Sequence, residues 1–301
     1  MSSQEPDAPD DVLGGASGLE EQSRSSELDE FLEASRERVD SHLDAVLPAE
    51  TQHPAELHRA MRYAVFSGGK RVRPALAFGA ALAVSADLEL AVPIAGAVEL
   101  VHACSLVLDD LPSQDDNPLR RGQAAVHIAF DHATAVLAGS ALLVDAFAQL
   151  AQLADPAAST AVGARLTRTI GSKGLIGGQV DDLAFDPAEA SLEEVEFINL
   201  RKTAALFSFS TWSGGLAGGC AGGELGRLDA FGRAYGLAFQ IVDDLFDEDL
   251  DECSILHVLT REQARGRVHE LVDEAVREVE AFGPNDWVLS GLARRLETSM
   301  S

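Results

Sequence analysis

Apolar residues recur in this chain at the three- and four-residue spacing of amphipathic helices, while alternating strand patterns bounded by hairpin turns are almost absent. A first helix is indicated from Ser26 to about Pro48, and a second from Pro54 to the break at 67–69, where glycine supplies a left-handed helix end. Further helical segments fit about residues 73–84, 90–111, 131–153, 157–172, 191–220, 224–248 and 260–281. Several are apolar on most faces, as central helices of a bundle are. The pattern predicts an all-α protein with a single domain over residues 26–301.

Charge and composition restrict the environment and the partners of the chain. Its 49 acidic and 23 basic residues give a formal charge of −26, so the surface should repel nucleic acid and anionic membranes. Residues 1–25, rich in Ser, Gly, Asp and Glu, are predicted to form a disordered acidic tail. A secretory signal and a lipid-facing span are not indicated, and Cys104, Cys220 and Cys253 form no metal-binding pattern. We therefore expect a cytoplasmic protein without a membrane span.

The first candidate site is an apolar helix that ends in four carboxylates. It runs from Glu99 to Asp116 and reads ELVHACSLVLDDLPSQDD. His102 and Asp109 are seven residues apart and therefore share a helix face, while Pro112 disturbs the helix so that Asp115 can turn back toward the same space. Carboxylates are out of place in such an apolar wall, which indicates a functional role.

A second acidic cluster lies at 239–247 and reads FQIVDDLFD. Asp243 and Asp247 stand one helical turn apart and face the same way. Hard oxygen ligands suit Mg²⁺, which takes one or two carboxylates per ion and completes its shell with water and substrate phosphates. Asp runs also arise by chance in an Asp-rich chain, but two runs that both emerge from apolar helices favour a site that holds a diphosphate between them.

Basic residues supply candidate anion-binding groups. The segment Gly68-Gly69-Lys70-Arg71 lacks the Ser or Thr that must follow the lysine of a phosphate-binding P-loop, so nucleotide binding is rejected there and a helix end with loop charges stays open. Arg120-Arg121-Gly122 either forms ion pairs with the acidic cluster or binds a phosphate. Lys202, one of only three lysines, opens an apolar stretch with Thr203 and is expected to be functional.

In this arrangement the chain resembles the trans-isoprenyl diphosphate synthases, also called the polyprenyl synthetase family. The resemblance covers about residues 55–250 and depends on five ordered pieces. They are the segments 68–74 (GGKRVRP), 99–122 with its acidic and Arg-Arg-Gly runs, 177–182 (GGQVDD), 202–203 (KT) and 239–247. The resemblance implies an antiparallel helical bundle around a deep central cavity, of the isoprenoid synthase type, and a homodimer.

The implied reaction joins isopentenyl diphosphate to an allylic diphosphate held by Mg²⁺ ions, three of which are expected. The metal positions carried over are Asp109, Asp110, Asp115, Asp243, Asp244 and Asp247. Arg120, Lys202 and Gln240 match positions that steady the leaving diphosphate, and Thr203 and Gln240 match those facing the allylic cation. Lys70, Arg73, His102 and Arg121 match the isopentenyl diphosphate site.

Product length in the resembled family depends on side-chain bulk just before the first acidic motif. Cys104 and Ser105 stand there, and because both are small we expect a C20 product, geranylgeranyl diphosphate, rather than C15 farnesyl diphosphate. Phe130 or Phe147 is the alternative floor of the chain pocket.

The chain departs from the resembled family after the second acidic motif. Family members normally carry a lysine-containing loop there, whereas this chain has no lysine beyond Lys202. Arg261, Arg265 or His257 is a hypothetical substitute cation. The departure keeps open a weakly active prenyl-diphosphate-binding subunit of a heteromeric synthase. A class I terpene cyclase is less favoured, since its second metal motif normally mixes Asn or Asp with Ser and Glu.

Overall fold

The computed structural model describes the backbone of residues 13–85, 87–247 and 253–300, and side chains from residue 24 onward. Residues 1–12 of the predicted acidic tail lie outside the described residues, so their disorder stays a prediction. Helix α1 (Leu13–Val46) begins earlier than the start expected at Ser26. Its first buried side chain among those described is Leu28, so packing of α1 begins where the apolar spacing indicated it. Helical hydrogen bonding continues past the packed stretch, because each added residue adds one bond.

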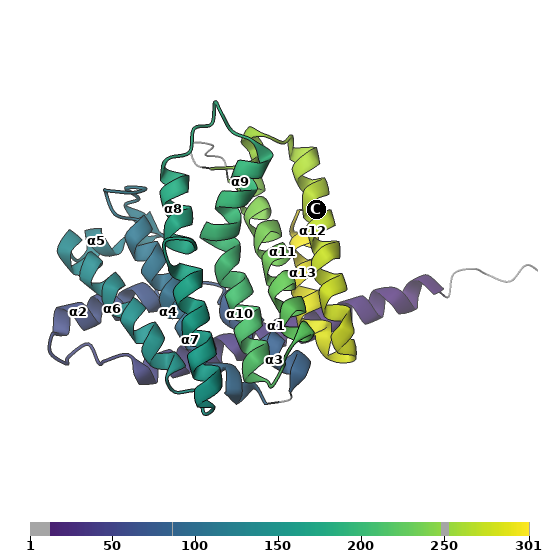
Figure 1. The fold of residues 1–301 in the computed structure, drawn as a ribbon, viewed down its shortest axis with the longest axis horizontal. Helices are drawn as coiled ribbons and strands as arrows, with labels where there is room; N and C mark the ends of the chain where they lie inside the picture. Colours follow the sequence, from purple (N-terminus) through teal and green to yellow (C-terminus); the bar gives the residue numbers. More distant parts are fainter. Residues whose placement is uncertain (1–12, 86, 248–252, 301) are drawn as a thin grey trace, which may run out of the picture.

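The described chain is a helical bundle, which confirms the predicted all-α class (Figure 1). After α1 the longer elements are α2 (Ala55–Phe66), α3 (Val72–Val84), α4 (Val92–Asp109), α6 (His132–Leu150), α7 (Pro156–Ile170), α8 (Leu175–Leu183), α9 (Leu192–Asn199), α10 (Ala205–Ala217), α11 (Gly223–Phe246), α12 (Arg261–Val279) and α13 (Trp287–Ser299). Short elements are η1 (Leu88–Ala91), α5 (Val126–Ala129), the π-turn η2 (Leu200–Ala204), η3 (Ile255–His257) and η4 (Glu280–Asp286). Strands β1 (Leu119–Arg120) and β2 (Gln123–Ala124) form a two-residue antiparallel hairpin in which Arg120 pairs with Gln123.

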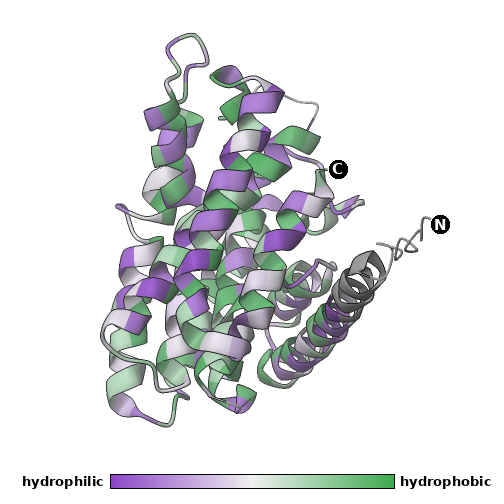
Figure 2. Ribbon diagram, turned by 90° about the vertical axis from the view of Figure 1, so that its right-hand side faces the viewer, coloured by the Kyte–Doolittle hydropathy of each residue, from purple (hydrophilic) through white to green (hydrophobic). Residues whose placement is uncertain are grey.

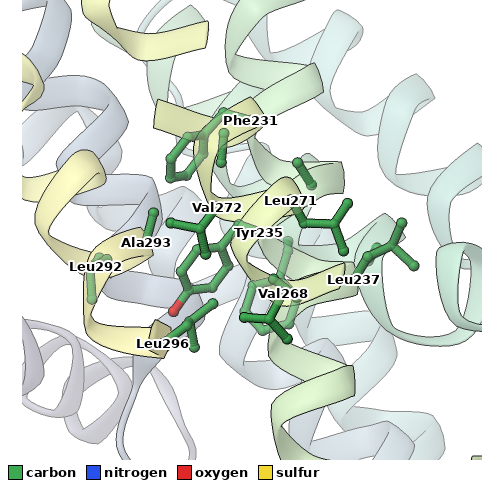
Figure 3. Packing of buried hydrophobic residues seen from close by; sticks show 14 of the residues in the cluster. Phe231, Tyr235, Leu237, Val268, Leu271, Val272, Leu292, Ala293 and Leu296 are labelled. Carbon is green, nitrogen blue, oxygen red and sulfur yellow. The ribbon is translucent and has the colours of Figure 1, made fainter. Parts of the chain in front are cut away.

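Two hydrophobic clusters form the core of the bundle. One joins α11, α12 and α13, where Tyr235 packs among Val272, Ala293 and Leu296 (Figure 3). The other joins the helices from α1 to α7 with one face of α10. Hydrophobic and hydrophilic residues alternate along the helices, as expected when each buries one face (Figure 2).

Helices α3 and α10 cross with their backbones nearly touching, between the two hydrophobic clusters. A Cβ atom at Gly214 would lie 2.1 Å from the Ala77 carbonyl oxygen, so only glycine fits at this crossing. The contact fixes α3, and with it the loop before α3 that carries Lys70, against the centre of the bundle.

Sequence patterns missed two of the longer helices and one turn. Helix α8 contains Gly177 and Gly178, whose low helix propensity hid it. Helix α13 buries Val288, Leu292 and Leu296 at helical spacing, a signal that was present in the sequence. The single helix expected over 191–220 is interrupted by the π-turn at 200–204.

Two stretches of the described chain are long and apolar enough to span a membrane by composition alone, Leu88–Asp109 and His132–Leu150. The first is 72% buried inside the bundle, as the core helix of a globular protein is. The second is only 39% buried and exposes Val136, Leu137 and Val144 on one face. Location in the cytoplasm stays a prediction from composition.

Candidate active site

The first acidic motif forms a closed turn at the end of α4. Asp109 is the last helical residue, and the Asp115 N–H donates to the Asp109 carbonyl oxygen at 3.0 Å. This bond turns the chain back, so that both side chains line one cavity of about 570 Å³. The motif therefore presents two carboxylates to the same space.

The second acidic motif ends α11 on the opposite wall of this cavity, which we call the acidic cavity. Asp243 and Asp247 both line it, and the Asp247 N–H donates to the Asp243 carbonyl oxygen at 2.9 Å. The acidic cavity therefore brings together four of the six aspartates expected to hold metal.

The other two aspartates, Asp110 and Asp244, are buried and hold neighbouring groups. Asp110 accepts from Arg120 Nε at 2.9 Å. Asp244 accepts from Gln240 Nε2 at 2.9 Å and from the Ile255 N–H at 2.8 Å. Neither residue lines the acidic cavity, so the geometry gives both a supporting position behind the aspartates that do line it.

Arg120 and Lys202 are the cations of the acidic cavity. Arg120 pairs with Asp110 and keeps its outer edge toward the cavity. Lys202 Nζ lies 2.6 Å from Asp182 Oδ2 on α8. Burial lowers the pKa of Lys202, but the nearby carboxylates led by Asp182 outweigh burial and raise the pKa above its ordinary value. Both side chains are therefore positive at neutral pH.

Lys202 reaches the cavity from the π-turn η2, a type of turn that often occurs at functional sites, and Thr203 follows Lys202 in the same turn. Thr203 Oγ1 donates to Gln240 Oε1 at 2.9 Å, which joins the turn to α11. Helix α8 lies directly against the turn, because a Cβ atom at Gly178 would be 2.5 Å from the Lys202 nitrogen. The glycine pair at 177–178 therefore permits the approach that sets the position of Lys202.

Asp109, Asp115, Asp182, Asp243 and Asp247 line the acidic cavity against two cations, Arg120 and Lys202, and burial makes ionisation of the carboxylates costly. Burial raises the pKa of Asp109 to about 7, with the charge of Asp115 adding to the effect and Lys202 opposing it. Burial also raises the pKa of Asp243 to about 6, against the opposing charge of Arg73. Such a site favours a cation, and its oxygen donors are the ligands that Mg²⁺ prefers.

These carboxylates do not form a closed cage. Among the described residues no three His, Cys, Asp or Glu side chains are grouped closely enough to hold an ion alone. Mg²⁺ commonly takes one or two carboxylates and completes its shell with water and phosphate oxygens, so the donor set fits Mg²⁺ bound together with a diphosphate.

A second cavity of about 530 Å³, which we call the basic cavity, is lined by Lys70, Arg73, His102 and Arg121. The guanidinium of Arg73 lies 4.2 Å from the ring centre of Phe207, and Arg73 Nη1 is 3.5 Å from His102 Nε2. Burial lowers the pKa of Arg73 to about 10, which keeps this residue positive at neutral pH. Burial, followed by the charge of Arg73, lowers the pKa of His102 well below its ordinary value, so the imidazole is neutral.

Arg71, next to these residues, has a structural position. It is 5% exposed and pairs with Glu99 at 2.5 Å and with Asp40 at 2.8 Å. These ion pairs fix the corner between α2 and α3. Arg121, in the turn between β1 and β2, donates a hydrogen bond to the Gly68 carbonyl oxygen in the same corner. The corner therefore presents Lys70 as the exposed cation.

The two residues expected to control product length lie on α4 before Asp109. Cys104 is buried in the apolar cluster, and Ser105 is half-buried and donates to the His102 carbonyl oxygen at 2.9 Å. Phe130 and Phe147 pack against the same cluster. Cys104 is therefore a small side chain within the packed wall between α4 and its neighbours.

Arg261 and His257 follow the second motif but are occupied by other contacts. Arg261 Nη1 donates to the Leu245 carbonyl oxygen at 2.6 Å, and the His257 ring lies 5.7 Å from that of Phe185. Arg261 therefore stabilises the end of α11, one turn from the acidic cavity. That Arg261 or Arg265 takes the place of the loop lysine of the resembled family stays a hypothesis.

Sequence reasoning did not select several residues that line the acidic cavity. They include Asp182, Asn199, Phe246 and Cys253. Asp182 was detectable, since the pair Asp181-Asp182 ends an otherwise apolar segment. No local sequence pattern marks Cys253 or Asn199 as a site residue. Only the tertiary fold places them at the cavity.

Both cavities suit diphosphate groups, the acidic one through bound cations and the basic one through direct contacts. The chain belongs to the polyprenyl synthetase family, whose model matches residues 54–261. This match confirms the resemblance drawn from the motifs.

Named relatives agree with the family. The heterodimeric geranylgeranyl pyrophosphate synthase large subunit 1 of Arabidopsis thaliana is 41% identical over 236 residues, which cover 75% of this chain and 63% of the relative. Geranylgeranyl pyrophosphate synthase 4 of the same plant is 39% identical over 223 residues, covering 72% and 59%. The matched segment thus spans about three fifths of these two relatives.

Solved structures of similar proteins cover nearly the whole fold. An FPP/GFPP synthase from Zymomonas mobilis, in its apo form, has a TM-score of 0.83 and 35% identity, over 90% of this chain and 98% of the other. A geranyltransferase from Helicobacter pylori, complexed with magnesium and isoprenyl diphosphate, has a TM-score of 0.78 and 31% identity, over 90% and 96%.

Proposed function

We propose that this chain is a short-chain trans-prenyltransferase that condenses isopentenyl diphosphate with an allylic diphosphate. The observation that carries the proposal is the acidic cavity, in which two separate acidic helix ends face one space together with Lys202. The basic cavity supplies a second anion site next to the first along α11, because Phe239 lines the basic cavity and Asp243, one helical turn later, lines the acidic cavity.

The allylic diphosphate is assigned to the acidic cavity. Bound Mg²⁺ ions would neutralise the diphosphate charge and stabilise it as a leaving group. Asp109, Asp115, Asp243 and Asp247 would hold these ions, whose number stays a prediction. Lys202 and Arg120 add fixed positive charge from the protein, and no nucleophile from the protein is required.

Isopentenyl diphosphate is assigned to the basic cavity, where Lys70, Arg73 and Arg121 offer charge-assisted donors. Its alkene would attack the allylic carbon as the carbon–oxygen bond to the diphosphate breaks, and the resulting cation would then give up a proton to the departed diphosphate. Thr203 and Gln240, which are hydrogen-bonded to each other, would face the allylic cation with their oxygen atoms. Burial of the apolar walls excludes water from the cationic carbon.

The proposed product is C20 geranylgeranyl diphosphate. Cys104 and Ser105 on α4 are small, so neither side chain would close the chain pocket at C15. The test is product analysis with labelled isopentenyl diphosphate, Mg²⁺ and, separately, C5, C10 and C15 allylic diphosphates. A C20 product supports the proposal, whereas a stop at C15 moves the pocket floor to Phe130 or Phe147.

A catalytically weak subunit of a heteromeric synthase is the second candidate. It is favoured by the lack of lysine after Lys202. The name of the Arabidopsis relative, a heterodimeric synthase large subunit, supports only the heteromeric assembly. Mg²⁺-dependent diphosphate binding without elongation from any starter would select this candidate over the first.

We propose a homodimer formed through the exposed apolar residues of α6 and α8. Val136, Leu137 and Val144 are 39%, 60% and 67% exposed on α6, and α8 adds Ile176 and Val180. Large apolar side chains exposed on a globular protein commonly mark an interface when they gather on one surface. Light scattering on the purified chain tests the assembly.

A further inference from the structure

The turn that carries the first acidic motif contains a neutral side chain, Gln114, between its aspartates. Gln114 Nε2 donates to the Leu108 carbonyl oxygen at 2.7 Å, and Gln114 Oε1 accepts from Gln179 Nε2 at 3.1 Å. Gln179 is 8% exposed on α8. Both ends of the Gln114 amide therefore have partners on two different helices.

These two bonds act on the part of the turn that sets the spacing of Asp109 and Asp115. The Gln114 N–H donates to the Leu111 carbonyl oxygen at 2.9 Å, and the next N–H, of Asp115, closes the turn on Asp109 at 3.0 Å. A shift of the Gln114 backbone would therefore move the carboxylate of Asp115 directly.

Electrostatics oppose this turn whenever cations are absent. Asp109, Asp110, Asp115 and Asp116 lie within eight consecutive residues, and like charges held this closely repel. A neutral amide can hold the turn closed without adding charge. Gln179 also stands one helical turn before Asp182, the partner of Lys202, so the same contact links the acidic turn to the helix that orients Lys202.

We propose that Gln114 is a positioning residue that holds Asp115 toward Asp109 for divalent cation binding, through its hydrogen bonds to Leu108 and Gln179. The inference deepens the proposed function and depends on it for the identity of the site. Gln114 itself does not line the acidic cavity, so its effect acts through Asp115.

The test substitutes Gln114→Met, which keeps the side-chain length and removes both hydrogen bonds. Calorimetry measures binding of inorganic diphosphate in the presence of Mg²⁺, and steady-state kinetics measure the KM for isopentenyl diphosphate. We expect about tenfold weaker Mg²⁺-dependent diphosphate binding, the equivalent of about 1.4 kcal/mol. The KM for isopentenyl diphosphate should change less than about twofold, since the basic cavity is not touched.

Two further variants keep the test decisive. Gln123→Met is the matched control, because Gln123 is an exposed glutamine on β2 and should bind as the wild type does. Gln179→Met should weaken binding as well, and the double variant should be no weaker than Gln114→Met alone, since either change breaks the shared bond.

The positioning role would be overturned if Gln114→Met bound diphosphate with wild-type affinity. It would also be overturned if the variant lost affinity equally at both substrate sites and had a lower melting temperature. Failure of the proposed function has a different signature. A wild-type chain that binds Mg²⁺ and diphosphate yet never elongates an allylic substrate would reject the reaction and leave the comparison of variants valid.

Discussion

Replacing Gly178 by alanine should displace Lys202 from the acidic cavity. The added Cβ would lie 2.5 Å from the Lys202 nitrogen and 2.9 Å from the Arg201 carbonyl carbon, and both obstacles are backbone atoms that cannot rotate away. Ordinary contact therefore requires α8 and the π-turn to separate by about 1 Å, a displacement that can lower turnover about 100-fold when it moves a substrate-positioning group. Overpacking of this size should also destabilise the fold by about 1–3 kcal/mol.

The assay is kcat with saturating isopentenyl diphosphate and allylic diphosphate, accompanied by thermal unfolding. Gly163→Ala on α7 is the matched control, because a Cβ there meets nothing within 4 Å. That control should retain kcat and gain about 0.5–1 kcal/mol of stability, as alanine does inside a helix. Wild-type kcat in Gly178→Ala would refute the reasoning that close backbone contact sets the position of Lys202.

Further predictions concern the buried aspartate, pH and assembly. Asp110→Asn should lower kcat/KM for the allylic diphosphate about tenfold by weakening a charge-assisted bond, whereas Asp116→Asn, an exposed charge change in the same turn, should have little effect. The raised pKa values of Asp109 (about 7) and Asp243 (about 6) mean that the folded protein binds protons more tightly than the unfolded chain. Their contribution to the stability of the metal-free protein should therefore fall as pH rises from about 4 to 7, and Mg²⁺ should reverse this loss near pH 7. Melting curves with and without Mg²⁺ test the expectation. A melting temperature that depends on neither pH nor Mg²⁺ would contradict it. Leu137→Glu should convert the proposed dimer to monomer in light scattering with unchanged helicity by circular dichroism, and a persistent dimer would reject the α6 interface.

Helix ends and motif spacing predicted most of the bundle because those signals are local. The return of Asp115 toward Asp109 was expected from Pro112, and the closing hydrogen bond is present in the structure. The positions of Asp110 and Asp244 were not predictable in the same way. Each has the same residue type as its neighbour, and only the packing of Arg120 and Ile255 distinguishes a buried aspartate from one that faces the cavity.

Helix α8 illustrates what local patterns leave out. Two adjacent glycines argue against a helix when propensity alone is counted. In the structure the glycines allow α8 to lie against the π-turn, and this tertiary contact outweighs their propensity cost. The pairing of Lys202 with Asp182 depends on the same contact, so sequence patterns could point to Asp182 but not to its pairing with Lys202.

The π-turn also sets the rotational phase between two helices. It adds a residue to what would otherwise be one continuous helix from α9 through α10. Because each helical residue turns the chain by about 100°, deleting a single residue from 200–204 would rotate α9 by about that angle relative to α10. Phe197 and Asn199 would then face different neighbours while α10 kept its own. A substitution at Lys202 and a one-residue deletion beside it are therefore different perturbations. The first removes a charge, and the second changes which side chains of α9 face each neighbouring helix.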